Sequence, residues 1–299
     1  MSAGTLVGVP VDADVLARVL ARHDDYRILR RMQPMDRRRS SSDCQGVITG
    51  IAIDVETTGL DLNESAIIEL AVQRFRADEH GRIVETGHPR SWLEDPGVPI
   101  TEMITRLTRL SKADVAGKSI MEAEAASMIA DSDVVIAHNA GFDRGFVERR
   151  LPFAAGKAWI CSMRDFDWQA AGFEGRTLTH LLGQMGWFYE AHRAGTDVTA
   201  LLHLLDHRLD TGTTVLKSLL ERASRPTWMI EATGAPFEAK DVLRLRGYRW
   251  NAPRKVWSRE VEHSEFDDEI EWASLYVYRG GRKPAFREVT WRERYAATA

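Results

Sequence analysis

Four carboxylates and one histidine stand in three short motifs of this 299-residue chain. In chain order they are Asp54, Glu56, Asp143, His192 and Asp197. Hard divalent cations such as Mg²⁺ and Mn²⁺ prefer carboxylate oxygens as ligands. A histidine beside such a site can accept a proton from a water molecule. Together these residue types suit metal-assisted attack of water on a phosphodiester.

The first motif ends an apolar, β-branched run from Gly50 to Val55, which predicts a buried strand. Residues two apart on a strand point to the same face, so Asp54 and Glu56 would aim at one point. Two carboxylates so close repel each other unless a cation lies between them. The simpler interpretation of this motif alone is a strand that ends in a polar turn.

The second motif follows another short apolar run, Ser132 to Ala137, which predicts a second strand. A turn at residues 139–141 then leads into a helix carrying Phe142 and Phe146 at helical spacing. Asp143 would lie in the first helical turn, where the helix dipole favours an acid. Taken alone, Asp143 could simply be a capping residue.

The third motif precedes a helix expected over Ala194 to Leu205. Asp197 lies near the first turn of that helix, and His192 lies in the loop before it. A histidine next to a metal-binding aspartate can deprotonate the attacking water. A lone loop histidine is more often just solvated, so the pairing with Asp197 carries the hypothesis.

In order, spacing and context, the three motifs resemble those of the DEDDh, or DnaQ-like, 3′–5′ exonuclease superfamily, which includes proofreading subunits of bacterial DNA polymerases. The matching residues are 54–60, 138–143 and 192–197, and the resemblance covers about residues 47–206. It implies a ribonuclease H-like fold and two divalent metal ions, Mg²⁺ or Mn²⁺. The resemblance also implies that Asp54, Glu56, Asp143 and Asp197 are metal ligands and that His192 is the general base. It implies a 3′-hydroxyl pocket lined by Thr57 and Thr58, with Leu60 as a wedge against the terminal nucleobase. His138, Asn139 and Phe142 would line the other side of that pocket.

The elements that must position these residues suggest an α/β domain over residues 47–225. Further strands are predicted at Ile67 to Arg76 and Arg82 to Leu93, and helices at Ser119 to Ala130 and Leu178 to Met185. Early strands that look antiparallel, followed by strands alternating with helices, predict a mixed sheet flanked by helices.

Residues 1–46 form an N-terminal extension. A charged helix is expected over Val11 to Met32, with Asp12 or Asp14 as its cap. A linker follows from Gln33 to Gly46, and we interpret its run of three arginines, residues 37–39, as a solvated, mobile segment rather than a phosphate contact.

Residues 226–299 form a small C-terminal α+β module that holds five of the nine tryptophans. Residues 247–250 and 254–257 resemble a short pattern found in modules appended to bacterial nucleic-acid enzymes. Aromatic residues interleaved with arginines could stack on bases and bind phosphates. The favoured alternative is that the tryptophans form the module's core and its charges pair across the surface.

Composition narrows the class of protein. The chain is 44% hydrophobic and 28% charged, as in ordinary globular proteins, and no apolar run is long enough to span a bilayer. Its two cysteines, Cys44 and Cys161, form no CxxC pair, which argues against a zinc site or a disulfide framework. With no secretory signal evident, we expect a cytoplasmic protein without membrane contact. The middle domain has 19 basic and 26 acidic residues, which argues against a broad electrostatic grip on duplex DNA.

The sequence therefore predicts an exonuclease that releases 5′-mononucleotides from single-stranded 3′ ends, with DNA favoured over RNA. An RNA-trimming exonuclease with the same site is one alternative, because only the sugar pocket distinguishes the two. The other is an interaction subunit of a polymerase or repair assembly. The chain shows no polymerase motif, so any role in proofreading or DNA repair would need a partner.

Overall fold

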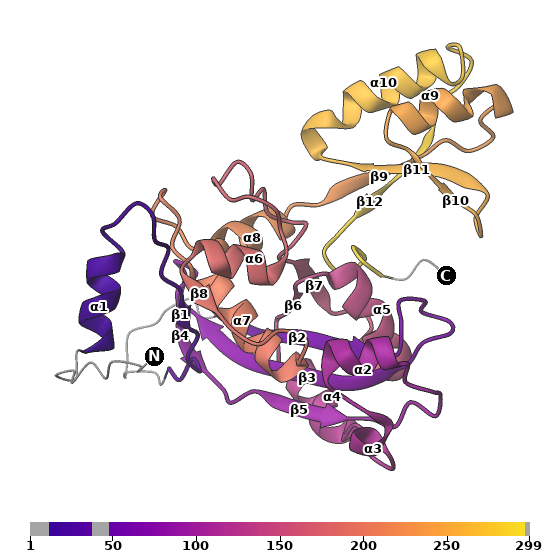
Figure 1. Ribbon diagram of the computed structural model, residues 1–299. Helices are drawn as coiled ribbons and strands as arrows, with labels where there is room; N and C mark the ends of the chain where they lie inside the picture. Colours follow the sequence, from indigo (N-terminus) through magenta and orange to yellow (C-terminus); the bar gives the residue numbers. More distant parts are fainter. Residues whose placement is uncertain (1–11, 38–47, 297–299) are drawn as a thin grey trace, which may run out of the picture.

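The computed structural model describes residues 12–37 and 48–296. Its larger part is built on a six-stranded sheet with the order β4-β3-β2-β6-β7, in which β5 also pairs with β3 (Figure 1). The pairings of β3 with β2, β4 and β5 are antiparallel, and those of β6 with β2 and β7 are parallel. The strands are β2 (Ile48–Thr57), β3 (Ile67–Ala77), β4 (Ile83–Thr86), β5 (Arg90–Leu93), β6 (Val134–Ala137) and β7 (Ala158–Cys161). The predicted mixed sheet is confirmed.

Helices cover both faces of this sheet (Figure 1). Because side chains alternate along β2, Ile51, Ile53 and Val55 enter the core shared with the helix after β6, whereas Ala52 enters the opposite core. Asp54 and Glu56 lie two and four residues after Ala52, so their side chains point to the same face of the sheet as Ala52, the face covered by the helices after β7. One layer holds α4 (Glu122–Ala130) and α5 (Ala140–Arg150); the other holds α6 (Leu178–Gln184), α7 (Ala194–Asp206) and α8 (Val215–Ala223).

The predicted single strand from Arg82 to Leu93 is wrong in one respect. It is two strands, β4 and β5, that pair with opposite ends of β3. Gly87 and Pro89 interrupt the run, and proline cannot donate a ladder hydrogen bond. Two short helices, α2 (Glu102–Thr108) and α3 (Lys112–Val115), and a 3₁₀ turn, η1 (Pro152–Ala154), complete the connections.

The N-terminal helix is shorter than expected. Helix α1 spans Ala13–Leu20, and Asp12 caps it by accepting a hydrogen bond from the backbone N–H of Asp14. Farther on, two residues expected in the helix form a strand instead, because β1 (Arg30–Arg31) pairs in parallel with β8 (Trp187–Phe188).

Within the predicted linker, Met35 is buried and Arg37 donates to both carboxylate oxygens of Asp206 at 2.8 and 2.5 Å. Interpreting Arg37 as freely solvated was therefore wrong. The other two arginines of the run, the rest of the linker and Cys44 lie outside the described residues.

The C-terminal module stands apart as a second lobe (Figure 1). Its sheet has the order β10-β11-β9-β12, and its helices pack on one face. Trp228, Trp257 and Trp272 pack against this core, while Trp250 is half exposed. The elements are β9 (Thr227–Glu231), η2 (Phe237–Ala239), α9 (Lys240–Leu245), β10 (Arg249–Asn251), β11 (Val256–Val261), η3 (His263–Glu265), α10 (Phe266–Tyr276) and β12 (Ala285–Val289).

Charged side chains of this module are largely paired. Both Arg246 and Arg259 bond to the carboxylate of Glu269, which is 1% exposed, and Arg254 pairs with Glu231. Most of these tryptophans pack in the core, and these arginines are engaged in ion pairs. The module's aromatic and basic residues therefore favour a structural role over phosphate binding.

After β12 the described chain, which ends at residue 296, returns to the large domain near α5 (Figure 1). The backbone N–H of Trp159 on β7 donates to the carbonyl of Trp291 at 2.9 Å. The guanidinium of Arg144 on α5 donates to the carbonyls of Arg294 at 2.6 Å and Arg292 at 2.8 Å. The tail that follows the module is thus part of the large domain's packing.

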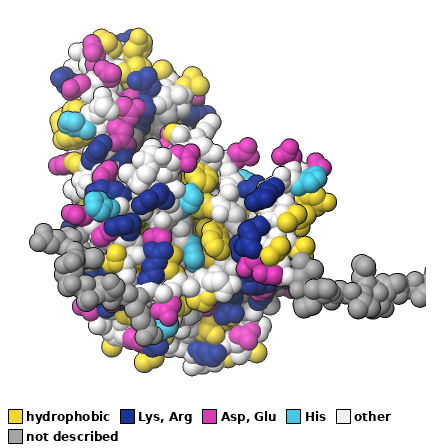
Figure 2. Space-filling model, turned by 90° about the vertical axis from the view of Figure 1, so that its left-hand side faces the viewer, with side chains coloured by type: hydrophobic (Ala, Val, Ile, Leu, Met, Phe, Trp, Pro, Cys, Tyr) yellow, Lys and Arg dark blue, Asp and Glu magenta, His cyan; other side chains and the backbone are white. Residues whose placement is uncertain are grey.

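Lys and Arg side chains are interspersed with Asp and Glu over the face shown in Figure 2, without one dominant sign of charge. Across residues 12–37 and 48–296, no helix combines the length and the apolar character that crossing a membrane requires.

Candidate active site

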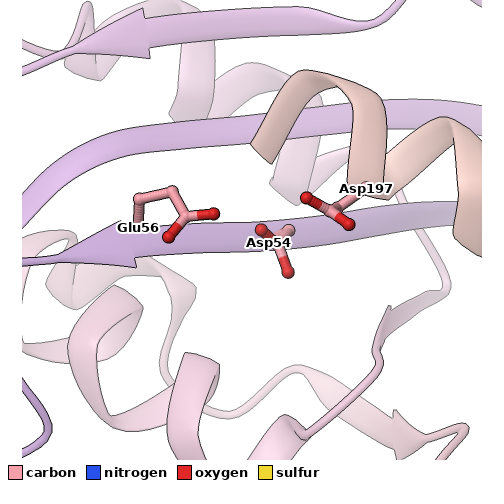
Figure 3. A group of neighbouring side chains, drawn as sticks. All are labelled: Asp54, Glu56 and Asp197. Carbon is pink, nitrogen blue, oxygen red and sulfur yellow. The ribbon is translucent and has the colours of Figure 1, made fainter. Parts of the chain in front are cut away.

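Strand β2 and helix α7 bring three carboxylates together (Figure 3). One oxygen from each of Asp54, Glu56 and Asp197 lies within 4.8 Å of the others. The strand supplies the first two because residues two apart share a face. The helix supplies the third from its first turn, where an acid is favoured by the exposed backbone N–H groups.

Protein hydrogen bonds fix the orientation of Asp197. Its Oδ2 accepts from the backbone N–H of Arg193 at 3.1 Å, and its Oδ1 accepts from the hydroxyl of Tyr189 at 2.9 Å. Burial and the neighbouring Asp197 carboxylate raise the pKa of Tyr189, so the phenol remains a donor. Sequence reasoning missed Tyr189; its place three residues before His192 was the available signal.

Asp143 lies in the first turn of α5, next to the three-acid cluster. It is 4% exposed, and its Oδ1 accepts a hydrogen bond of 3.2 Å from the backbone N–H of Val55. It lines the same pocket as the cluster acids, although it is not among the three whose oxygens meet. The backbone of β2 therefore positions the fourth acid as well as carrying the first two.

The electrostatics of the cluster favour a divalent cation. Burial raises the pKa of Asp54 well above its usual range, and the Asp143, Asp197 and Glu56 carboxylates raise it further. Burial, followed by the Asp197 charge, raises the pKa of Glu56 to about 8, and burial raises the pKa of Asp143 to about 7. Acids held this way bind protons near neutral pH unless a cation replaces them. The donor set, all hard oxygen, fits Mg²⁺ or Mn²⁺.

A fifth acid, Glu69, stands opposite Glu56 on the neighbouring strand β3. It is 1% exposed and accepts from Arg193 Nε at 3.1 Å, from the backbone N–H of Ala194 at 3.2 Å and from Ser91 Oγ at 2.6 Å. These bonds tie β3 and β5 to the start of α7. Sequence reasoning missed Glu69; an acid within the apolar first half of β3, residues 67–72, was the available signal.

Four acids, Asp54, Glu56, Asp143 and Asp197, line a pocket of about 360 Å³ that also holds His192. His192 has a left-handed backbone, φ 66°, which a non-glycine residue rarely adopts and which is frequent at functional sites. The structure also brings Leu60, His138, Asn139 and Phe142 to this pocket, as predicted. Met163, Thr177, Leu178 and Thr179, from a loop and the start of α6, close its far side and were not predicted.

The two threonines of the first motif do not line the pocket. Thr57 is buried and donates to the carbonyl of Gly59 at 2.6 Å, while the hydroxyl of Thr58 accepts from the backbone N–H of Ala66 at 3.0 Å. Their side chains shape the turn after β2, and the expected contact with a 3′-hydroxyl is not seen in their placement.

His138 is held by the protein on both ring nitrogens. Its Nε2 lies 2.8 Å from the carbonyl of Arg176, which can only accept, so Nε2 carries the proton and Nδ1 accepts from Ser162 Oγ at 2.8 Å. Burial lowers the pKa of His138 to about 4, although the hydrogen bond to the Arg176 carbonyl acts in the opposite direction and raises it. The neutral ring thus anchors the loop of residues 162–177 beside the pocket. By contrast, Asn139 Oδ1 is buried with no hydrogen-bond partner among the described residues.

Comparisons with known proteins agree with this geometry. A family model described as exonuclease matches residues 51–205. The PolC-type DNA polymerase III of Thermotoga maritima is 28% identical over 141 residues, which is 46% of this chain and 9% of that protein. Ribonuclease T of Blochmanniella pennsylvanica is 29% identical over 113 residues, 32% of this chain and 51% of the relative. The chain thus spans under a tenth of the polymerase relative and about half of the ribonuclease.

Among solved structures, exonuclease X in complex with 5′ overhanging duplex DNA is 25% identical, with a TM-score of 0.41, and the match covers 58% of this chain and 99% of that one. An exonuclease I structure gives a TM-score of 0.46 at 14% identity, covering 82% of this chain and 63% of that one.

Proposed function

The chain belongs to the exonuclease family, in its DnaQ-like DEDD group, and on that premise we propose that it is a metal-dependent 3′–5′ exonuclease that releases 5′-mononucleotides from single-stranded DNA ends. The observation that carries the proposal is the meeting of Asp54, Glu56 and Asp197 within 4.8 Å, with Asp143 beside them. Such a cluster is costly to fold unless cations bind it, so it is better explained by function than by stability.

Asp54, Glu56, Asp143 and Asp197 would hold two divalent ions, Mg²⁺ or Mn²⁺. When bound, such ions offset the charge of the phosphate and lower the pKa of a water molecule. The chain's own part is to orient the ligands. Tyr189 fixes Asp197, and the Val55 backbone fixes Asp143.

His192 would act as the general base from its loop at the pocket's edge. As the oxygen of the water forms a bond to phosphorus, His192 accepts the water's proton. The bond between phosphorus and the 3′ oxygen of the preceding nucleotide breaks, and that oxygen takes a proton from solvent. The products are a 5′-mononucleotide and a strand one nucleotide shorter, with a new 3′-hydroxyl.

The terminal nucleotide would occupy this pocket, in contact with Leu60 and Phe142. Leu60 is 85% exposed at the pocket, where it could press against the terminal base. Phe142, which packs with Phe146 at 4.8 Å between ring centres, offers a fixed apolar surface. The unpartnered Asn139 Oδ1 offers a hydrogen-bond acceptor to the substrate.

DNA is the proposed substrate because a match of 141 residues is to a DNA polymerase. A role in proofreading or repair beside a polymerase rests on that same match. The match to ribonuclease T supports RNA as the second candidate. The cytoplasmic location remains a prediction from the sequence.

The deciding experiment compares single-stranded DNA and RNA of one sequence, together with mismatched duplex ends, in Mg²⁺, in Mn²⁺ and in EDTA. We expect mononucleotide release from DNA in either metal and none in EDTA. Faster release from RNA would replace the DNA assignment with the second candidate, and undiminished release in EDTA would refute the metal mechanism.

A further inference from the structure

A second and larger cavity lies next to the active-site pocket. It has a volume of about 1000 Å³, close to three times that of the pocket. Three parts of the chain enclose it: the loop of residues 163–176, helix α8 through Ser218 and Arg222, and the C-terminal module through Glu262. Arg222 and Glu262 form an ion pair, so the module is fastened to α8 at the cavity's wall.

The cavity continues the active-site pocket. Met163 lines both, and Arg176 of the cavity is followed directly by Thr177 of the pocket. The carbonyl of Arg176 is also the acceptor that anchors His138, a pocket residue. A strand whose 3′ end occupies the pocket therefore has a path on which its preceding nucleotides enter the cavity.

Two cationic side chains of the cavity are free to bind a ligand. Arg164 and Arg176 are exposed, and neither guanidinium has a hydrogen-bond or ion-pair partner within residues 12–37 and 48–296. The acids nearby are mostly engaged. Asp165 is buried and accepts from the hydroxyl of Tyr295 at 2.6 Å and from the backbone N–H of Cys161 at 2.8 Å.

Of the three remaining acids, Asp167 accepts from the backbone N–H of Ala170 at 3.0 Å, and Glu262 pairs with Arg222. Only Glu174 lacks a side-chain hydrogen bond or ion pair within the described part of the chain. The lining carries three arginines and four acids, a formal charge of −1, so phosphate binding here would depend on the two unpaired guanidinium groups and not on a positive net charge.

Aromatic rings line the same cavity. Trp168 is 3% exposed and donates from Nε1 to the carbonyl of Ser162 at 2.9 Å, so it is a fixed support. Phe166 and Phe173 pack on it at ring-centre distances of 4.5 and 5.5 Å and remain partly accessible. Accessible rings on a rigid support, next to free arginines, are the elements of a platform that stacks bases and binds phosphates.

We propose that this cavity binds the nucleotides that precede the scissile end, with bases against Phe166 and Phe173 and phosphates at Arg164 and Arg176. The inference rests on the proposed exonuclease function and gives the substrate its class, a single strand long enough to fill both spaces. It also gives the C-terminal module a role, because Glu262 and its partner Arg222 close one wall.

The test measures the affinity of the full chain for a 5′-fluorescein single strand of about 20 nucleotides and for one of about three, by fluorescence anisotropy in Ca²⁺. The variant Arg164→Gln with Arg176→Gln should lose its preference for the longer strand. Each phosphate contact to a single strand contributes about 0.7 to the slope of log affinity against log salt, so the slope should fall by about 1.4. If the variant and the unsubstituted chain bind equally at 1 M salt, the variant should bind the longer strand roughly 25-fold more weakly at 0.1 M salt.

The matched control is Arg244→Gln with Arg249→Gln, the same change of charge on exposed residues of the module that do not line the cavity. It should keep both the preference and the slope. Phe166→Leu, which keeps an apolar side chain but removes the ring, should weaken the longer strand alone, by roughly fivefold or more. The inference is overturned if the first variant keeps the length preference, or if the control loses as much.

Failure of this inference is distinguishable from failure of the proposed function. Hydrolysis of the short strand by the unsubstituted chain tests the function alone. If that hydrolysis is seen while Arg164→Gln with Arg176→Gln binds long strands like the unsubstituted chain, the exonuclease stands and the cavity is not its substrate path.

Discussion

The hydroxyl of Tyr189 donates a hydrogen bond of 2.9 Å to Oδ1 of Asp197, the one acid of the three-carboxylate cluster that comes from a helix. This bond sets how the Asp197 carboxylate faces β2. When a residue that hydrogen-bonds to a metal ligand is mutated, metal affinity or activity typically falls by about 10- to 100-fold.

Tyr189→Phe, which keeps the ring and removes only this hydroxyl, should weaken Mn²⁺ binding by about 10-fold or more. Isothermal titration calorimetry gives the affinity directly, without an activity assay. Tyr278→Phe is the matched control, because the hydroxyl of Tyr278 makes a bond of the same length, 2.9 Å, to the carbonyl of Thr233 in the C-terminal module. Equal Mn²⁺ affinity in both variants would show that Tyr189 has no positioning role.

Asp54→Asn and Asp143→Asn should each abolish nearly all hydrolysis while the fold is retained. Neither motif contains a carboxylate beyond the proposed ligands themselves that could replace the one removed, and Asn is close in size and shape. Glu64→Gln, an exposed change in the turn after β2, is the control and should be fully active. Near-normal turnover by either Asp variant in Mg²⁺ would remove that residue from the ligand set.

His192→Ala should lower turnover by roughly 10²–10⁴-fold, the usual contribution of a positioned general base, with little change in substrate affinity. Single-turnover rates measured beside equilibrium binding in Ca²⁺ separate the two effects. An unchanged rate constant would reduce His192 to a loop residue.

The stability of the metal-free protein should fall as pH rises from about 5 to about 8. The pKa values of Glu56 and Asp143, about 8 and about 7 in the folded chain, exceed their ordinary values of 4.5 and 3.8. The folded state therefore binds more protons than the unfolded state across this window, so deprotonation costs it stability. Melting temperatures in EDTA should show the fall, and saturating Mg²⁺ should remove most of it because cations replace the protons.

Glu56→Gln should reduce the same pH dependence in EDTA, since one of the titrating acids is gone. A melting temperature that varies with pH equally in EDTA and in Mg²⁺ would contradict a cation site at the cluster.

Deleting residues 226–299 should destabilise the nuclease domain, contrary to what composition alone suggests. Arg144 is 2% exposed, and it donates to the carbonyls of Arg292 and Arg294, which the deletion removes. Glu148 still pairs with Arg144 at 2.7 Å in the truncated chain, but the two lost hydrogen bonds to the charged guanidinium should cost about 1.5 to 3 kcal/mol each. Chemical denaturation of the truncated and full chains measures the difference. A truncated chain as stable as the full one would show that the tail's packing contributes nothing.

The site was largely predictable because its geometry is local. The two-residue period of β2 fixed the shared direction of Asp54 and Glu56, and the first-turn preference for acids placed Asp197 and Asp143. Residues held by contacts distant in sequence were not predictable in this way. Glu69 reaches the site across the β2–β3 pairing, and Arg144 finds its partners 148 and 150 residues later.

The errors in the fold have the same origin. The helix expected to Met32 included Arg30 and Arg31, which instead form β1 and pair with β8, more than 150 residues away. The family resemblance implied that Thr57 and Thr58 line a 3′-hydroxyl pocket, whereas in the structure both hydroxyls make hydrogen bonds within the turn. Local periodicity does not report which backbone groups a turn needs to satisfy.

The most direct test of the metal-dependent exonuclease uses a single DNA strand labelled at its 5′ end, digested in Mg²⁺ and sampled over time. The expected result is a ladder of labelled strands that shorten one nucleotide at a time from the 3′ end, with unlabelled 5′-mononucleotides released, and no ladder from Asp54→Asn. Early release of a labelled mononucleotide would mean the opposite polarity, and a Mg²⁺-independent ladder, or one that Asp54→Asn still produces, would contradict the account at its centre.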